Sequence, residues 1–226
     1  MLAAALNIDP HADKRMLQLL FIDGIGGRSI FRAALLRQVA KLGVEALYFG
    51  YHPSRETLAQ IQGRLEAQLH SLAARGPYVL VGYSFGGVLA RMAVPQIARA
   101  GQPCHLILVA SPMHSMALSR RVAGWRAFRW LTGECGALTA SETDMATIAR
   151  PTVVTTCVFG TRPLLGIIDL AGSRPSDGMV SVQEVNPSLF NTALAQASSH
   201  PFIATSKATF RVISDCIAAC DSRRAP

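Results

Sequence analysis

The sequence predicts an α/β fold: a mostly parallel central sheet flanked by helices, with a small helical insertion. Two observations lead to this prediction. Short runs such as residues 78–82 (YVLVG) and 106–110 (LILVA) are apolar throughout, which is typical of strands buried on both faces. Segments with apolar residues at helical spacing alternate with these runs along the chain. That alternation indicates strands joined by crossover helices, and so a parallel sheet.

Strands are expected wherever a short apolar run is bounded by turn residues. The first such run, MLQLLFI, precedes a glycine-rich loop, and the third precedes another glycine-rich turn. In chain order, the expected strands cover residues 16–22, 44–49, 78–82, 106–110, 152–159 and 192–197.

Helices are expected between the strands, where apolar residues recur every three or four positions. The second of them is the clearest, with Ser54 as a plausible N-cap and Gly76 as its end. A later one contains Pro95, which predicts a kink. The expected helices cover residues 29–42, 54–75, 88–99 and 203–220.

Residues 111–150 interrupt this alternation between two core strands. Their pattern is helical but irregular, with Trp125, Phe128 and Trp130 among several arginines. We therefore expect residues 1–226 to form a single α/β domain into which residues 111–150 are inserted as a helical cap or lid.

Composition excludes several classes of protein. The 226 residues are 50% hydrophobic and 16% charged, which excludes a disordered, collagen-like or disulfide-scaffold protein. Uncharged stretches such as 102–119 are broken by proline and histidine and fall short of the roughly 20 apolar residues of a membrane span. Residues 1–8 are apolar but too short for a secretory signal, so a cytoplasmic location is expected.

The net charge and the cysteines exclude further partners. Lys and Arg number 22 against 14 Asp and Glu, a net charge of +8, but the basic residues are dispersed and no nucleic-acid-binding motif accompanies them. The five cysteines have neither the spacing of a zinc site nor that of a disulfide framework. We expect no nucleic-acid partner and no metal, and the sequence does not indicate an oligomeric state.

The segment Gly82–Tyr83–Ser84–Phe85–Gly86–Gly87 carries the strongest indication of chemistry. It is a G-x-S-x-G sequence between an expected strand and an expected helix, the context that a nucleophile elbow requires. Glycines allow the strand and helix to approach closely, and the helix N-terminus favours negative charge developing near Ser84. The alternative interpretation is a tight turn whose serine only caps the helix.

A serine nucleophile needs a base and an orienting carboxylate, which follow it in the order acid, then histidine, on folds with this elbow. His200 lies in a loop after the last expected strand, whereas His105 begins a strand and His114 lies in the insertion. His200 is therefore the predicted base. Asp177, in an Asp-Gly turn, is the favoured acid, with Asp169 second.

The oxyanion of such a reaction needs preorganised N–H donors. One is expected from Phe85, directly after the nucleophile. The second is expected from Ile25, in a loop with three glycines among residues 23–27. The loop lacks both the spacing of a dinucleotide-binding loop and the lysine of a P-loop, so phosphate binding is disfavoured.

These segments together resemble the α/β-hydrolase superfamily, and within it small bacterial esterase/lipase-like proteins. The matching pieces are IDGIGG, GYSFGG, GTRP, SDGMVSV and SSHPFI, which span nearly the whole chain in order. The resemblance implies an eight-stranded or slightly reduced sheet, a triad of Ser84, Asp177 and His200, and neither metal nor organic cofactor. Many relatives have histidine where this chain has Asp23, which puts the orientation of the oxyanion loop in doubt.

The resulting hypothesis is a serine hydrolase that cleaves carboxylic esters with an apolar acyl chain. Met113, Trp125 and Phe128 are the predicted substrate-binding residues, although simple packing also explains apolar residues at this spacing. Nearby arginines raise the further hypothesis of contact with an anionic lipid surface. Thioester hydrolysis or acyl transfer by the same triad, and a non-catalytic binding protein, stay open as alternatives.

Overall fold

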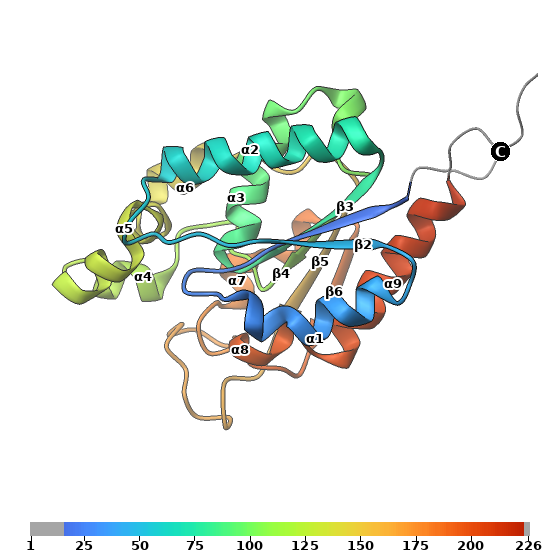
Figure 1. Ribbon diagram of the computed structural model, residues 1–226. Coiled ribbons are helices and arrows are strands. Elements are labelled where there is room, and N and C mark those ends of the chain that lie inside the picture. Colours follow the sequence, from blue (N-terminus) through green and yellow to red (C-terminus); the bar gives the residue numbers. More distant parts are fainter. Residues whose placement is uncertain (1–15, 224–226) are drawn as a thin grey trace, which may run out of the picture.

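The computed structural model describes residues 16–223, so the expectation about residues 1–8 lies outside the described residues. Its centre is one sheet of six parallel strands in the order β2-β1-β3-β4-β5-β6 (Figure 1). This confirms the predicted fold class, at the lower end of the strand number that the resemblance implied. The strands are β1 (Gln18–Ile22), β2 (Glu45–Phe49), β3 (Tyr78–Tyr83), β4 (His105–Val109), β5 (Thr155–Gly160) and β6 (Thr192–Gln196).

Helices cover both faces of the sheet, with α2 and α3 on one side and α1 and α9 on the other (Figure 1). Further helices lie in the connections after β4 and β5 and after β6. The helices are α1 (Ser29–Ala40), α2 (Leu58–Arg75), α3 (Phe85–Ala93), α4 (Ala117–Val122), α5 (Arg126–Ala140), α6 (Glu142–Thr147), α7 (Val182–Val185), α8 (His200–Ile203) and α9 (Lys207–Ser222).

The apolar runs of the sequence explain this two-sided core. Successive side chains of a strand point to opposite faces. In β1, Leu20 and Ile22 pack against α2 and α3, whereas Leu19 and Phe21 pack against α1 and α9. All four side chains are at most 1% exposed, so a strand without alternation is what this architecture requires.

The start of α2 differs from the prediction. Thr57, not Ser54, is the N-cap: its hydroxyl accepts the N–H of Gln60, and the Gln60 side chain accepts the N–H of Thr57. This reciprocal capping box satisfies two backbone donors at once, which a lone serine cannot do. The Ser54 assignment was therefore wrong.

Two other helices are shorter than expected. The helix after β3 begins at Phe85 and ends at Ala93, and Pro95 lies in a separate 3₁₀ turn, Val94–Gln96. The C-terminal helix is divided into α8 and α9, because Ser206 caps α9 by accepting the N–H of Thr209 at 3.0 Å. His200 consequently lies at the first residue of a helix rather than in a loop.

The inserted residues form α4, α5 and α6 between β4 and β5. Helix α5 bends at Gly133, whose φ is +52°. A side chain there would lie 2.2 Å from the carbonyl oxygen of Pro53, so both conformation and space require glycine. In Figure 1 the helices α4 and α5 lie at the end of the sheet at which α3 begins.

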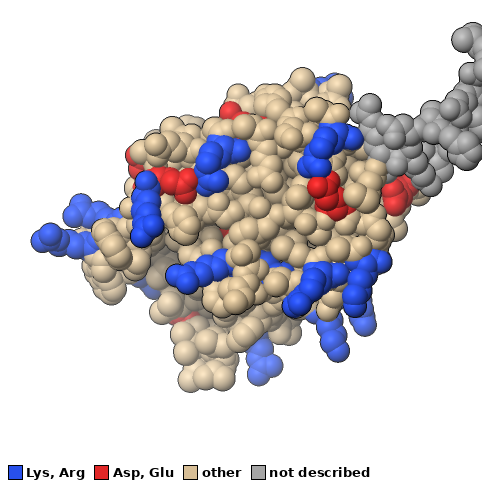
Figure 2. Space-filling view, viewed as in Figure 1, with Lys and Arg blue, Asp and Glu red and all other residues tan. Residues whose placement is uncertain are grey.

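On the face seen in Figure 2, basic side chains lie over several elements rather than in one patch. Within residues 16–223, no helix combines the length and the apolar character needed to span a bilayer.

His105 makes the stability of this fold depend on pH. The ring is buried between Thr156, whose hydroxyl lies 2.9 Å from Nε2, and Cys216. Burial, and secondarily the charge of Arg223, lower its pKa below the ordinary value of 6.5. The unfolded chain therefore binds a proton more readily, and the stability contributed by neutral His105 is lost as the pH falls below about 6.5.

We expect the free energy of unfolding to fall between about pH 7.5 and pH 5, and to fall less in His105→Gln. Urea unfolding at both pH values measures this difference. His70→Gln, at an exposed position of α2, is the matched control and should retain the wild-type pH dependence. Equal pH dependence in wild type and His105→Gln would contradict the prediction.

Candidate active site

Ser84 lies in the turn between β3 and α3. Its φ and ψ are +52° and −124°, a conformation that non-glycine residues rarely adopt. Its N–H donates to the carbonyl oxygen of Val109 at 2.8 Å, which fixes the turn to the end of β4. The serine is thus held at the carboxyl edge of the sheet, where ligands bind in folds of this kind.

Glycines next to Ser84 are required by close backbone approach. A Cβ at Gly82 would lie 2.5 Å from the Cα of Gly87, and one at Gly86 would lie 2.3 Å from the carbonyl oxygen of Ile22. Larger residues would push α3 away from β3 and β1. The G-x-S-x-G pattern therefore has a steric basis here.

A chain of hydrogen bonds joins Ser84, His200 and Asp177. His200 Nε2 lies 3.0 Å from Ser84 Oγ, and His200 Nδ1 lies 2.7 Å from Asp177 Oδ2. An ionised carboxylate only accepts hydrogen bonds, so Nδ1 carries the ring proton. In the neutral ring Nε2 then accepts from the Ser84 hydroxyl, which is the orientation a general base needs.

Other contacts fix the two partners of Ser84. Asp177 Oδ1 accepts the N–H groups of Met179 and Val180 at 3.0 and 2.8 Å. The carbonyl of Asp177 accepts the N–H of His200, and the Tyr83 hydroxyl donates to the carbonyl of His200 at 2.8 Å. Asp177 and His200 are only 2% and 4% exposed, so the hydrogen bond between them is shielded from bulk water.

Asp169, the second choice of acid, has different partners. Its carboxylate accepts from the Ser176 hydroxyl at 2.8 Å and from Arg174 Nε at 3.2 Å. Burial alone would raise the pKa of Asp169, but these hydrogen bonds outweigh it and lower the pKa. Of the two acids, the structure places Asp177 against His200.

The predicted oxyanion residues lie next to Ser84. Ile25 and Phe85 line the same cavity as Ser84 and His200. The loop of Ile25 passes close to the serine: a Cβ on Gly24 would lie 3.0 Å from the Cβ of Ser84. Phe85 is the first residue of α3, where a helical N–H has no acceptor within its own helix.

The negative charge of Asp23 is compensated by an ion pair with Arg32. Arg32 Nη2 lies 2.9 Å from Asp23 Oδ1, Arg32 Nε contacts both carboxylate oxygens, and the Tyr48 hydroxyl donates to Oδ2 at 3.1 Å. Burial and the adjacent Asp23 charge raise the pKa of Tyr48, so it remains a donor. The guanidinium of Arg32 also stacks on Tyr83 at 4.7 Å. The carboxylate is thereby compensated and does not line the cavity beside Ser84.

The cavity at Ser84 has a volume of about 260 Å³. Its wall comes from the oxyanion loop, from α3, α4 and α5, and from the segments around Met179 and Pro201. The apolar side chains on it are Ile25, Phe85, Met116, Leu118, Phe128, Met179 and Pro201.

Of the three predicted substrate-binding residues, only Phe128 lies on this wall. Met113 is 4% exposed and packs in the core with α3 and α5, and Trp125 is 66% exposed. The assignment of Met113 and Trp125 is corrected accordingly. Thr132, one helical turn after Phe128, and Met179, two residues after Asp177, also line this wall and were not predicted.

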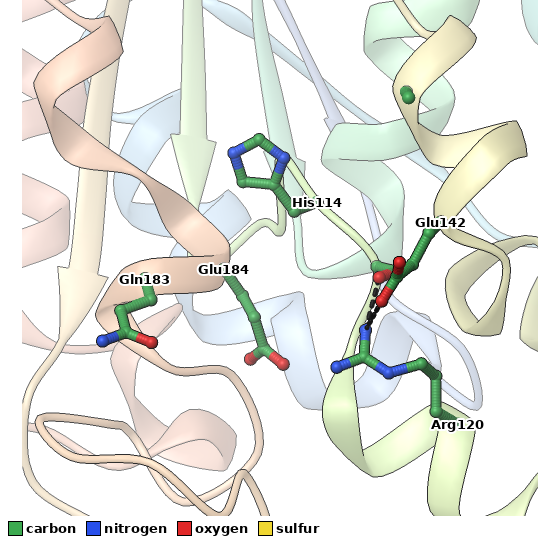
Figure 3. A pocket seen from close by; sticks show the side chains of 7 residues that line it. His114, Arg120, Glu142, Gln183 and Glu184 are labelled. Carbon is green, nitrogen blue, oxygen red and sulfur yellow. Dashed lines mark hydrogen bonds and ion pairs between the residues drawn. The ribbon is translucent and has the colours of Figure 1, made fainter.

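A second, polar hollow of about 380 Å³ lies beside α4 and α7 (Figure 3). Its charges are already matched. Glu184 accepts the N–H groups of Ala117 and Ser181, and Arg120 pairs with Glu142 and with the hydroxyl of Ser115. His114 contacts Asn186 rather than a serine. These contacts join α4 to α7, and among the residues that line the hollow no nucleophile is paired with a base.

No protein-family model and no curated protein matches the sequence. Solved structures do match. The mature lipase BlEst2 of Bacillus licheniformis has a TM-score of 0.64 at 18% identity, over 91% of this chain and 94% of the lipase. A structure of the metagenome-derived lipolytic enzymes LipS and LipT has a TM-score of 0.64 at 12% identity, over 92% and 94%.

The RedJ thioesterase of the prodiginine pathway in Streptomyces coelicolor also matches, with a TM-score of 0.51 at 18% identity, over 88% of this chain and 84% of the thioesterase. At such identities the likeness concerns the fold. Taken with the parallel sheet and the strand–serine–helix turn, it shows that this chain has the α/β-hydrolase fold.

Proposed function

We propose that this chain is a serine hydrolase that cleaves carboxylic esters through an acyl-serine intermediate on Ser84. The observation that carries the proposal is the hydrogen-bond chain from Asp177 through His200 to Ser84 at the end of an apolar cavity. Fold alone does not imply function. A serine in a strained turn whose hydroxyl donates to a buried, carboxylate-oriented imidazole is the arrangement that acyl transfer requires.

In the proposed reaction, Ser84 Oγ attacks the ester carbonyl carbon while His200 Nε2 takes the hydroxyl proton. Asp177 holds the Nδ1–H and stabilises the imidazolium. The backbone N–H groups of Phe85 and Ile25 stabilise the oxyanion. His200 then gives its proton to the departing alcohol, and the acyl group stays on Ser84. His200 then takes a proton from water as the water oxygen attacks the acyl-serine carbonyl. The bond to Ser84 Oγ breaks, His200 returns the proton to that oxygen, and the carboxylic acid is released.

The acyl group of the substrate is expected to occupy the cavity. Seven of its wall side chains are apolar, which supports an apolar acyl chain. Residues 111–150 supply Met116, Leu118 and Phe128 to this wall, which supports their role as a cap over the site. The predicted contact with anionic lipid stays a prediction, supported by exposed Trp125 and Trp130 next to Arg126 and Arg129.

Thioester hydrolysis is the second candidate. The similarity to the RedJ thioesterase favours it, and the same three side chains would perform it. The acyl-serine is common to both reactions, and only the leaving group differs. Paired esters and thioesters of one acyl chain separate them by their kcat/KM values.

Labelling with a fluorophosphonate, followed by mass mapping of the adduct, tests the proposal. Fluorophosphonates phosphonylate activated serines, so the adduct is expected on Ser84 in the wild type and is expected to be absent from Ser84→Ala. Ser71→Ala is the matched control, because Ser71 is exposed on α2 and does not line the cavity, so labelling is expected to stay intact. Folded wild-type protein without an adduct would favour the non-catalytic binding protein instead.

A further inference from the structure

Three hydroxyl side chains of the inserted helices line the cavity at Ser84. They are Ser119 of α4 and Thr132 and Thr139 of α5, and they are 5%, 8% and 3% exposed. Buried hydroxyls are costly unless they are hydrogen-bonded. Their partners therefore indicate what they can still offer to a ligand.

Each hydroxyl has a single proton, and all three protons are used within the protein. Thr132 donates to the carbonyl oxygen of Phe128 at 2.7 Å, and Thr139 donates to that of Gly136 at 3.0 Å. Ser119 Oγ lies 2.8 Å from Thr139 Oγ1. The carbonyl of Gly136 can only accept, so we assign the Thr139 proton to that bond and Ser119 as the donor to Thr139.

The cavity consequently offers hydroxyl lone pairs and no free hydroxyl proton from this cluster. Two lone pairs stay on Ser119 Oγ and two on Thr132 Oγ1, while Thr139 keeps one. Of the described residues on the cavity wall, none is Asp, Glu, Lys or Arg. The complementary ligand group is therefore a neutral hydrogen-bond donor, not an ammonium group, a carbonyl or a carboxylate.

We propose that this cluster selects acyl groups that carry a hydroxyl on the chain. The inference rests on the proposed function, since it assumes that the acyl group of the substrate fills the cavity. A hydroxyl donates to Ser119 or Thr132, whereas a methylene at that place leaves their lone pairs unpaired. A keto group brings a second acceptor against them and is disfavoured for the same reason.

The test compares esters of medium-length straight-chain acids that differ at one carbon. Each carries a hydroxyl, a keto group or a plain methylene at successive positions, and kcat/KM is measured for all. We expect at least one hydroxy ester to exceed both of its counterparts by about 10-fold or more. Ser119→Ala and Thr132→Val are each expected to reduce this ratio toward one while the plain ester is still hydrolysed.

Thr147→Val is the matched control for the threonine substitution. Like Thr132, Thr147 donates to a backbone carbonyl of its own helix, that of Asp144, but it is exposed on α6 and does not line the cavity. This variant is expected to retain the full preference for the hydroxy ester. A preference that persists in both Ser119→Ala and Thr132→Val would overturn the assignment of these hydroxyls.

A binding measurement separates failure of this inference from failure of the proposed function. Calorimetric titration of Ser84→Ala with the paired methyl esters reports selectivity without turnover. Tighter binding of the hydroxy ester supports the inference whether or not the wild type hydrolyses it. Equal affinities overturn the inference, and hydrolysis of plain esters by the wild type would then still support the proposed function.

Discussion

Replacement of Ser84 by alanine is expected to lower kcat/KM for a 4-nitrophenyl ester by roughly 10⁴- to 10⁶-fold. The loss is this large because no other group can form the acyl intermediate. The residual rate comes from binding and the oxyanion donors alone. The steady-state rate of 4-nitrophenol release measures the effect. The protein is first freed of contaminating esterases by a second chromatographic step.

The strained turn supplies a control that separates lost chemistry from lost folding. Alanine keeps the unfavourable φ of +52°, whereas glycine adopts it freely. Ser84→Gly is therefore expected to be as inactive as Ser84→Ala and yet to unfold at a higher temperature than the wild type. Activity within about 10-fold of wild type in both variants would exclude Ser84 as the nucleophile.

The central strands could be predicted because burial on both faces favours apolar residues in them. Residues 78–82 and 106–110 are buried on both faces, so every position is apolar and the run is visible without any tertiary information. Helix ends were harder to predict, because neighbouring residues compete to cap the first turn. Thr57 caps α2 because Gln60 completes the capping box, whereas Ser54 three residues earlier has no such partner.

The elbow could be predicted because it needs only a strand, a serine between glycines and a following helix, all within a few residues of Ser84. Asp177 and Asp169 could only be ranked, since both follow β5 in the same long connection. The two aspartates differ in their tertiary contacts. Oδ1 of Asp177 accepts two N–H groups of its own turn, leaving Oδ2 for His200, while Asp169 is occupied by Arg174 and Ser176.

The cavity wall was the least predictable part of the site. Trp125 is the N-cap of α5, so its side chain precedes the helical turn that carries Phe128 and Thr132. Met113 lies in the loop before α4, where its N–H bonds to the carbonyl of Glu184 and its side chain enters the core. Helical spacing is no guide to positions that lie outside the helix.

Asp177→Asn is expected to lower kcat by about 10⁴-fold with little change in fold. Oδ1 of residue 177 accepts the N–H groups of Met179 and Val180, so the oxygen of an asparagine must occupy that position. The amide nitrogen then faces His200 Nδ1 and donates to it. The ring proton moves to Nε2, and His200 can no longer accept the proton of Ser84.

Asp169→Asn is the matched control for Asp177→Asn, because both remove one carboxylate from the same connection. Asp169 contacts Arg174 and Ser176 and not His200, so its replacement is expected to leave kcat within about threefold of wild type. The reverse result, a large loss in Asp169→Asn and none in Asp177→Asn, would reassign the acid. Equally large losses of kcat in both variants would indicate that the connection between β5 and β6 needs both carboxylates to keep its structure. In that case both variants would also unfold at a lower temperature than the wild type.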